Sequence, residues 1–266
     1  MSWLKKLAAD SPIAFSFMTT VALWVCYIAA GVAASLLAAT AEGQQIASAV
    51  GRLIATLVFL SVIWRLGWLS AAGITKLGGW SSWLLVLPVL AYEILSHLYA
   101  FFGSFGFGAP DRPMAWAVAL NGAAAGLLEE VVFRALVLCA LVRAWGGTRS
   151  GVLKSALVSS LFFGAAHLIH LALGRPAPLV LLLFVSAFLG GIYYAGFALH
   201  ARSVWPAVAL HVFLNAVIGA QAVSNPGFAE TVSGWLLVLA LQLPAVGLGI
   251  WMIARAQARP VVPGAA

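Results

Sequence analysis

Long apolar runs recur along the whole sequence, and they constrain the fold more than any other feature. The first begins at Pro12 and continues to about Ala39. A run of about 20 apolar residues is long enough to cross the hydrocarbon core of a bilayer as a helix. Inside lipid every backbone N–H and C=O must be paired within the protein, and no alternating strand pattern competes with the helical reading, so we expect membrane-spanning helices.

Eight such segments follow one another, separated by short connections that contain Gly, Pro or charged residues. Their approximate limits are 12–39, 46–64, 82–103, 114–142, 155–173, 179–199, 204–222 and 234–254. The sequence therefore predicts an all-α, polytopic membrane helix bundle of about eight transmembrane helices. Composition agrees with this fold class, because 64% of the 266 residues are hydrophobic and only 8% are charged. A soluble domain could not bury that much apolar surface.

We expect one integral membrane domain over residues 1–266, with a motif-bearing core at about 114–222 and a disordered tail at about 255–266. The net charge of +7 is spread singly over the ends of the apolar runs. No basic patch with interleaved aromatic residues is present, so we expect no nucleic-acid partner.

The positions of the basic residues predict the orientation of the chain in the membrane. With the N-terminus inside, the inner side holds Lys5, Lys6, Arg65, Lys76, Arg143, Arg149, Lys154, Arg202, Arg255 and Arg259. The outer side then holds only Arg112 and Arg175. Because short cytoplasmic loops are enriched in Lys and Arg, this asymmetry predicts a multi-pass protein of the cell (inner) membrane with both termini in the cytoplasm.

Ionisable residues inside predicted spans are costly in lipid and therefore indicate function. The fourth span contains Glu129, Glu130 and Arg134. Glu130 and Arg134 are one helical turn apart and can pair. Glu129 points about 100° away from Glu130 on a helix, so it stays available as a general base. A buried ion-pair network that only fixes helix packing is the alternative.

Two later spans carry pairs with the same four-residue spacing. Phe163 and His167 share one face of the fifth span, and His211 and Asn215 share one face of the seventh. Each pair alone is also compatible with hydrogen bonds that only join membrane helices. Small residues precede the glutamates between Gly122 and Gly126, and they allow close helix approach. We therefore expect the three spans to converge.

In order and spacing, these segments resemble the CAAX-protease and bacteriocin-processing family, also called the CPBP or ABI family. The family motifs are Glu-Glu-x-x-x-Arg, Phe-x-x-x-His and His-x-x-x-Asn or Asp. In this sequence they read Glu129/Glu130/Arg134, Phe163/His167 and His211/Asn215. The resemblance implies a fold of eight helices and an intramembrane endopeptidase. Its substrates would be membrane-associated peptides or proteins processed at a CAAX-type tail, a leader or a sorting signal.

The resemblance also implies roles for individual residues. Glu129 would activate the attacking water, and His167 would position that water. His211 and Asn215 would stabilise the oxyanion of the tetrahedral intermediate. The supporting residues would be Glu130, Arg134 and Phe163.

We expect a glutamic-type protease without a cofactor. The sequence has no His-Glu-x-x-His helix of the kind that binds zinc in many metalloproteases. A zinc-dependent alternative, with Glu129, His167 and His211 as ligands, stays open.

Two other functional classes also stay open. A non-catalytic membrane scaffold or immunity protein could keep the same fold. A proton-coupled transporter could use Glu93 and His97 together with Glu129 and His167 as a proton relay. Neither inverted repeats nor broken helices are evident, which argues against transport. The expected partners are membrane lipid and a peptide or membrane-protein substrate, and the sequence assigns no role to His170.

The charge asymmetry makes a direct topological prediction. A reporter fused near Glu42 should report an extracytoplasmic location, and one fused near Lys76 a cytoplasmic location, because the intervening segment crosses the membrane once. Alkaline phosphatase and green fluorescent protein fusions at both positions measure this. The opposite pattern at both positions would reverse the predicted orientation.

Overall fold

The computed structural model describes the backbone of residues 2–105, 111–224 and 231–256, and the side chains of these ranges except 93–105 and 224. Within these ranges the secondary structure is entirely helical, which confirms the predicted all-α class. The helices are α1 (Ser2–Asp10), α2 (Pro12–Leu37), α3 (Ala41–Arg65), α4 (Trp80–Phe105), α5 (Arg112–Glu130), η1 (Val131–Leu138), α6 (Cys139–Trp145), α7 (Arg149–Ala166), α8 (Ile169–Ala172), α9 (Ala177–Ala201), α10 (Trp205–Ser224) and α11 (Val232–Arg255).

All eight predicted spans are helical, although their lengths and breaks differ from the prediction. Six helical segments of the described chain are long and apolar enough to cross a membrane: α2, α3, α7 with α8, α9, α10 and α11. The described apolar part of α4, Trp80–Tyr92, is shorter. The fourth predicted span is the continuous succession α5, η1 and α6, which carries the two glutamates and the arginine. The chain is therefore a multi-pass membrane protein with approximately the predicted number of spans.

The fifth predicted span and the start of the predicted disordered tail need correction. The fifth span, predicted as one helix over 155–173, begins earlier at Arg149 and breaks after Ala166, with the short α8 beyond the break. The N-terminal residues before the first span form the separate helix α1. Of the predicted disordered tail, Arg255 belongs to α11 and residues 257–266 lie outside the described residues. The side chains of Glu93 and His97 also lie outside them.

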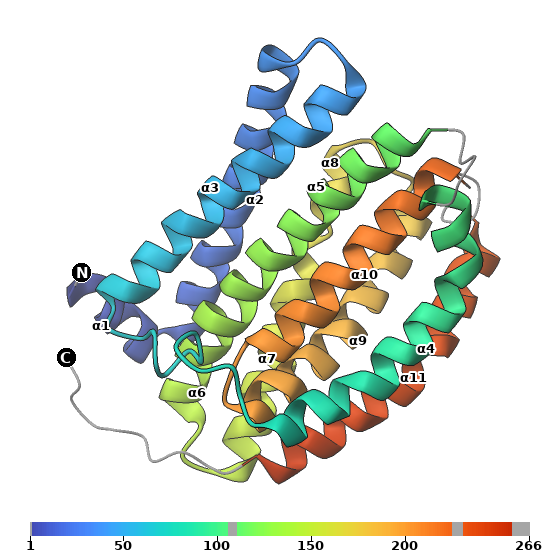
Figure 1. The fold of residues 1–266 in the computed structure, drawn as a ribbon. Coiled ribbons are helices and arrows are strands. Elements are labelled where there is room, and N and C mark those ends of the chain that lie inside the picture. The colour runs from blue at the N-terminus through green and yellow to red at the C-terminus, as the bar shows by residue number, and fades with distance from the viewer. Residues whose placement is uncertain (1, 106–110, 225–230, 257–266) are drawn as a thin grey trace.

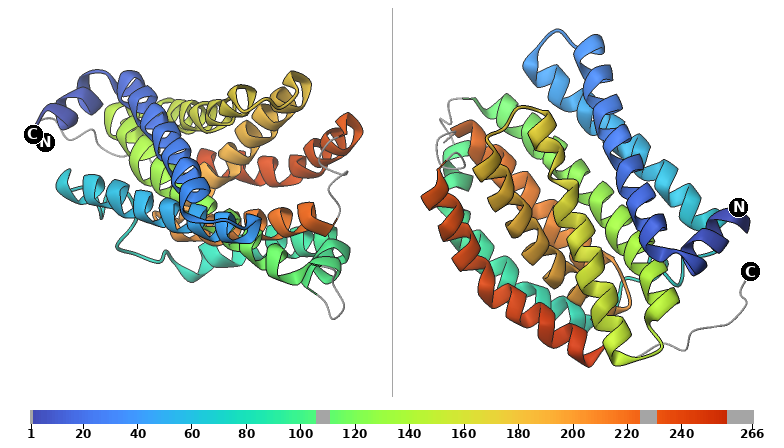
Figure 2. Two further views of the ribbon diagram at one scale, coloured as in Figure 1. Left: turned by 90° about the horizontal axis from the view of Figure 1, so that it is seen from above. Right: turned by 180° about the vertical axis from the view of Figure 1, so that it is seen from behind.

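The helices form a bundle with a hairpin of α2 and α3 at one side, as Figure 1 shows. Helix α5 lies between this hairpin and α10, and it packs against both α3 and α10. Helix α9 packs against α7 and α11 on the other side of the bundle (Figure 2). Helix α1 and the C-terminal end of α11 lie toward the same end of the bundle, as an even number of spans requires (Figure 1).

A π-helical segment, η1, interrupts the α-helical geometry directly after Glu130. All its residues are buried, including Arg134. The Ser159 hydroxyl of α7 donates to one of the backbone carbonyls of η1, Phe133 O, at 2.9 Å. The distortion therefore ties the charged segment to α7. Helix periodicity in the sequence gave no sign of it.

Glycines on α5 allow α10 to approach its backbone. A Cβ on Gly122 would collide with the carbonyl group of Asn215, and one on Gly126 would lie 3.1 Å from the backbone of His211. The small residues before the glutamates thus hold the helix that carries His211 and Asn215 against α5, as the sequence predicted.

This contact predicts a specific sensitivity to methyl groups. Gly122→Ala should lower the melting temperature in detergent, because overpacking a close helix contact costs about 1–3 kcal/mol. The matched control is Gly247→Ala, since a Cβ at Gly247 meets nothing within 4 Å. The control should be neutral or slightly stabilising, given the higher helix propensity of alanine. Equal melting temperatures for the two variants would contradict the importance of the contact.

Candidate active site

A buried ion pair between Glu130 and Arg134 lies at the centre of the polar residues. Arg134 Nη1 is 3.0 Å from Glu130 Oε1, and the two side chains are 1% and 0% exposed. His211 from α10 reaches the same oxygen, with Nδ1 at 2.8 Å. The same carboxylate oxygen of Glu130 therefore contacts Arg134 of η1 and His211 of α10, which lie far apart in the sequence. The predicted pairing of Glu130 with Arg134 is confirmed.

Aromatic rings enclose the Arg134 guanidinium. Its carbon atom Cζ lies 4.3 Å from the ring centroid of Phe163 and 5.1 Å from that of Tyr194. Its Nη2 donates to the carbonyl oxygen of Gly191 at 3.3 Å. Such cation–π contacts partly replace the hydration that the arginine loses on burial. Phe163 and Tyr194 therefore help to keep a charged pair inside the protein.

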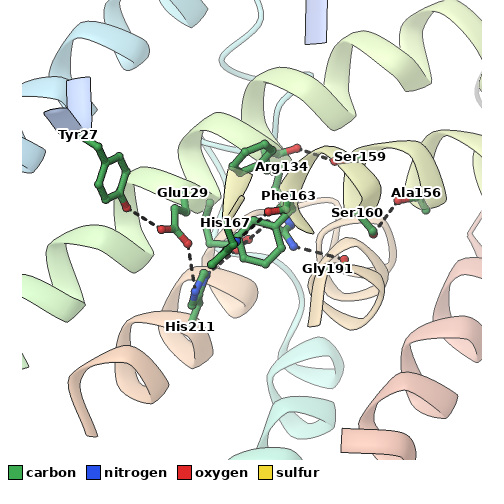
Figure 3. Close-up of polar contacts among 12 residues, drawn as sticks. Tyr27, Glu129, Arg134, Ala156, Ser159, Ser160, Phe163, His167, Gly191 and His211 are labelled. Atoms are coloured by element: carbon green, nitrogen blue, oxygen red, sulfur yellow. Dashed lines mark hydrogen bonds and ion pairs between the residues drawn. The ribbon is translucent and has the colours of Figure 1, made fainter. Parts of the chain in front are cut away.

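Glu129 faces a different side of the helix from Glu130, as the sequence predicted. Its Oε1 accepts a hydrogen bond of 2.6 Å from the Tyr27 hydroxyl of α2, and its Oε2 lies 3.6 Å from His211 Nε2. Figure 3 shows Glu129 between Tyr27 and His211, with a dashed line to each. Glu129 is 13% exposed, whereas Glu130 is fully buried. Of the two glutamates, Glu129 is thus the more accessible.

His167 ends its own helix inside the bundle. Because a carbonyl oxygen only accepts hydrogen bonds, the 3.0 Å contact with Phe163 O places a proton on His167 Nδ1. The Trp24 indole of α2 donates to another carbonyl at this helix end, Ala166 O, at 2.7 Å. These bonds satisfy helix-end groups that lipid could not. In its neutral form, His167 then presents Nε2 as an acceptor.

Phe163 joins the two histidines. Its ring meets His167 edge to face with centroids 5.2 Å apart, and it meets His211 in the same way at 5.6 Å. On the other side, the ring of Tyr194 stacks on His211 with centroids 4.6 Å apart. Both imidazoles are therefore fixed in orientation by aromatic contacts (Figure 3).

Asn215 lies one turn after His211 on α10, and its backbone contacts Gly122. Among the described residues its side-chain amide has no hydrogen-bond partner. His170 lies on α8, with its ring 6.4 Å from that of His167. Apart from Asn215 and His170, the predicted residues form one contact network.

Sequence reasoning missed two residues of this network. Tyr27 lies on α2 and Tyr194 on α9. Neither is a charged residue type, and neither belongs to a motif defined by spacing. The only signal available was that both are hydroxyl-bearing aromatic residues inside apolar spans, where a hydroxyl needs a partner.

The described residues contain no group of three or more His, Cys, Asp or Glu side chains arranged to hold a metal ion.

One comparison with known proteins bears on this site. The family model described as type II CAAX prenyl endopeptidase Rce1-like matches residues 111–217. That segment includes every residue of the three motifs, from Glu129 to Asn215, and confirms the resemblance drawn from them. No curated protein and no solved structure matches the chain.

The buried pair predicts an asymmetric response to neutralisation. Glu130→Gln should destabilise the protein by about 3–5 kcal/mol, because it leaves Arg134 as an unpaired buried cation. Adding Arg134→Gln should recover part of the loss. Thermal melting of the purified single and double variants measures both effects.

A surface pair supplies the control for this comparison. Lys6 and Asp10 are 3.4 Å apart and largely exposed, so Asp10→Asn should leave the melting temperature unchanged. A double variant less stable than Glu130→Gln alone would show that the two charges do not stabilise each other.

Proposed function

We propose that the chain is a CAAX-type intramembrane protease with Glu129 as its catalytic base, since the type II CAAX prenyl endopeptidase Rce1-like family model matches residues 111–217. The observation that carries this role is the division of labour between the glutamates. Glu130 is occupied by Arg134 and His211, whereas Glu129 is partly exposed and, among the described residues, has polar contacts with Tyr27 and His211.

In the proposed reaction the Glu129 carboxylate takes a proton from a water molecule, whose oxygen attacks the scissile carbonyl carbon. His211 and Asn215 donate hydrogen bonds to the oxyanion that forms. His167 Nε2 accepts a hydrogen bond from the attacking water and orients it. Glu129 then returns the proton to the leaving nitrogen as the C–N bond breaks, so the carboxylate is regenerated. No metal ion is required by this sequence of steps.

The substrate we propose is a membrane-associated peptide or protein with an apolar segment near the cleavage site. An apolar pocket of about 350 Å³ lies between α4 and α10. Its lining consists of Trp80, Trp83, Val86, Leu87, Leu90, Ala209, Leu210 and Phe213. A volume of this order suits a small hydrocarbon ligand. A lipidated CAAX tail, a leader or a sorting signal would each supply such a group. In the proposed orientation both termini of the protease face the cytoplasm.

The base role of Glu129 is tested by one substitution. Glu129→Gln keeps the shape and hydrogen bonding but removes the base, so turnover should fall at least about a hundredfold. The melting temperature should change little. Cleavage of a quenched fluorescent, prenylated CAAX peptide by purified protein measures the rate. Glu42→Gln, at an exposed position of α3, is the control.

The same assay exposes a wrong assignment. Near-normal cleavage by Glu129→Gln, together with a stable but inactive Glu130→Gln, would mean that the two roles are exchanged. If the CAAX peptide is not cleaved, proteomics of membrane fractions with and without Glu129→Ala should reveal an accumulated precursor.

The metal-free mechanism makes a separate prediction. Purified protein should keep its activity after treatment with phenanthroline or EDTA, since the proposed base is a carboxylate. Loss of activity that stoichiometric zinc restores would instead assign Glu129, His167 and His211 as zinc ligands.

A further inference from the structure

Arg52 is a second intramembrane arginine, and its surroundings differ from those of Arg134. It lies about 16 Å from the start of α3 at the α-helical rise, and it is partly exposed. Its Nη1 donates to the backbone oxygen of Asn121 at 3.0 Å and also to the Asn121 side-chain oxygen. Asn121 Nδ2 in turn donates to Gln45 Oε1 at 2.6 Å. Arg52 is thus held in place by neutral oxygens.

Arg52 has no acidic partner among the described residues. Arg134 is paired with Glu130 at 3.0 Å, whereas no carboxylate of the described chain forms an ion pair with Arg52. Its Nε is buried and has no hydrogen-bond partner. A cation within a membrane span is costly unless it is paired or serves a function. The Arg52 site is therefore suited to an anion that the chain itself does not supply.

The site lies one tyrosine side chain away from the proposed catalytic base. The Arg52 guanidinium lies 4.7 Å above the ring centroid of Tyr27, whose hydroxyl is 2.6 Å from Glu129. Three extended residues span about 10 Å, which is comparable to this path across the ring. A peptide bond held at Glu129 thus has its third following residue within reach of Arg52.

We propose that Arg52, oriented by Asn121 and Gln45, binds the C-terminal carboxylate of the peptide substrate. The inference rests on the proposed function and adds to it the recognition of the substrate's C-terminus. A CAAX tail ends the chain, so it offers a carboxylate a few residues beyond the cleaved bond. Guanidinium and carboxylate match in charge and in planar geometry. The C-terminus of the substrate would lie toward Asn121, on the side of Glu129 away from the cytoplasm.

The test uses two peptides of the same sequence, one ending in a free acid and one in an amide. The wild-type protein in phosphatidylcholine nanodiscs should prefer the acid by about tenfold to a hundredfold in kcat/KM, the range expected for one charge-assisted contact. Arg52→Gln should abolish this preference, mainly by raising KM for the acid. Arg52→Lys should keep part of it. Arg112→Gln, an exposed arginine at the start of α5, should keep all of it.

Each failure has a distinct meaning. Equal cleavage of acid and amide by the wild type would overturn the inference, as would an Arg52→Gln variant that slows both peptides equally. Dependence on Arg52 that appears only in anionic nanodiscs would assign the site to a lipid phosphate and overturn it as well. Cleavage of neither peptide by the wild type would reject the proposed function instead. If Arg52→Gln does not fold, Asn121→Ala should weaken the acid preference.

Discussion

The carboxylate of Glu130 is the group on which the site depends, because three elements meet at it. One of its oxygens forms an ion pair with Arg134 of η1 and accepts a hydrogen bond from His211 of α10, and Arg134 also donates to the carbonyl of Gly191 on α9. Each charged group alone would be prohibitively expensive at this depth. Together they form a compensated cluster that also fixes how α10 and α9 meet the π segment. The contacts that offset the cost of burying these charges therefore also fix how the helices meet.

This dependence explains which features could be predicted from the sequence. The pairs Glu130–Arg134 and Phe163–His167 are four residues apart, and helical geometry alone brings such residues together. The number and class of the spans follow from apolar length, since lipid leaves few other folds. The convergence of three polar spans was also predictable, because polar groups in lipid seek one another. All of these inferences rest on local spacing or on the solvent.

What the sequence did not predict depends on contacts between distant segments. Tyr27 reaches Glu129 only because the α2–α3 hairpin packs along α5, and no spacing rule relates residues so far apart. The π geometry after Glu130 and the helix break at His167 are likewise settled by partners on other helices, namely Ser159 and Trp24. Arg52 was visible as an ionisable residue in a span. Its neutral hydrogen-bond partners and its distance from Glu129 could not be predicted from the sequence.

The hydrogen bonds, ion pairs and one cation–π contact also run as one chain through the bundle, from Gln45 and Asn121 to Arg52, across Tyr27 to Glu129, and through His211 to Glu130 and Arg134. Each contact along this path therefore orients its neighbour. Arg134 is paired with Glu130, and Glu129 contacts Tyr27 and His211. Arg52 has no carboxylate partner within the described part of the chain. A network whose arginine at one end is paired with a carboxylate, and whose arginine at the other end has only neutral oxygens as hydrogen-bond acceptors, is what a site for an anionic substrate requires.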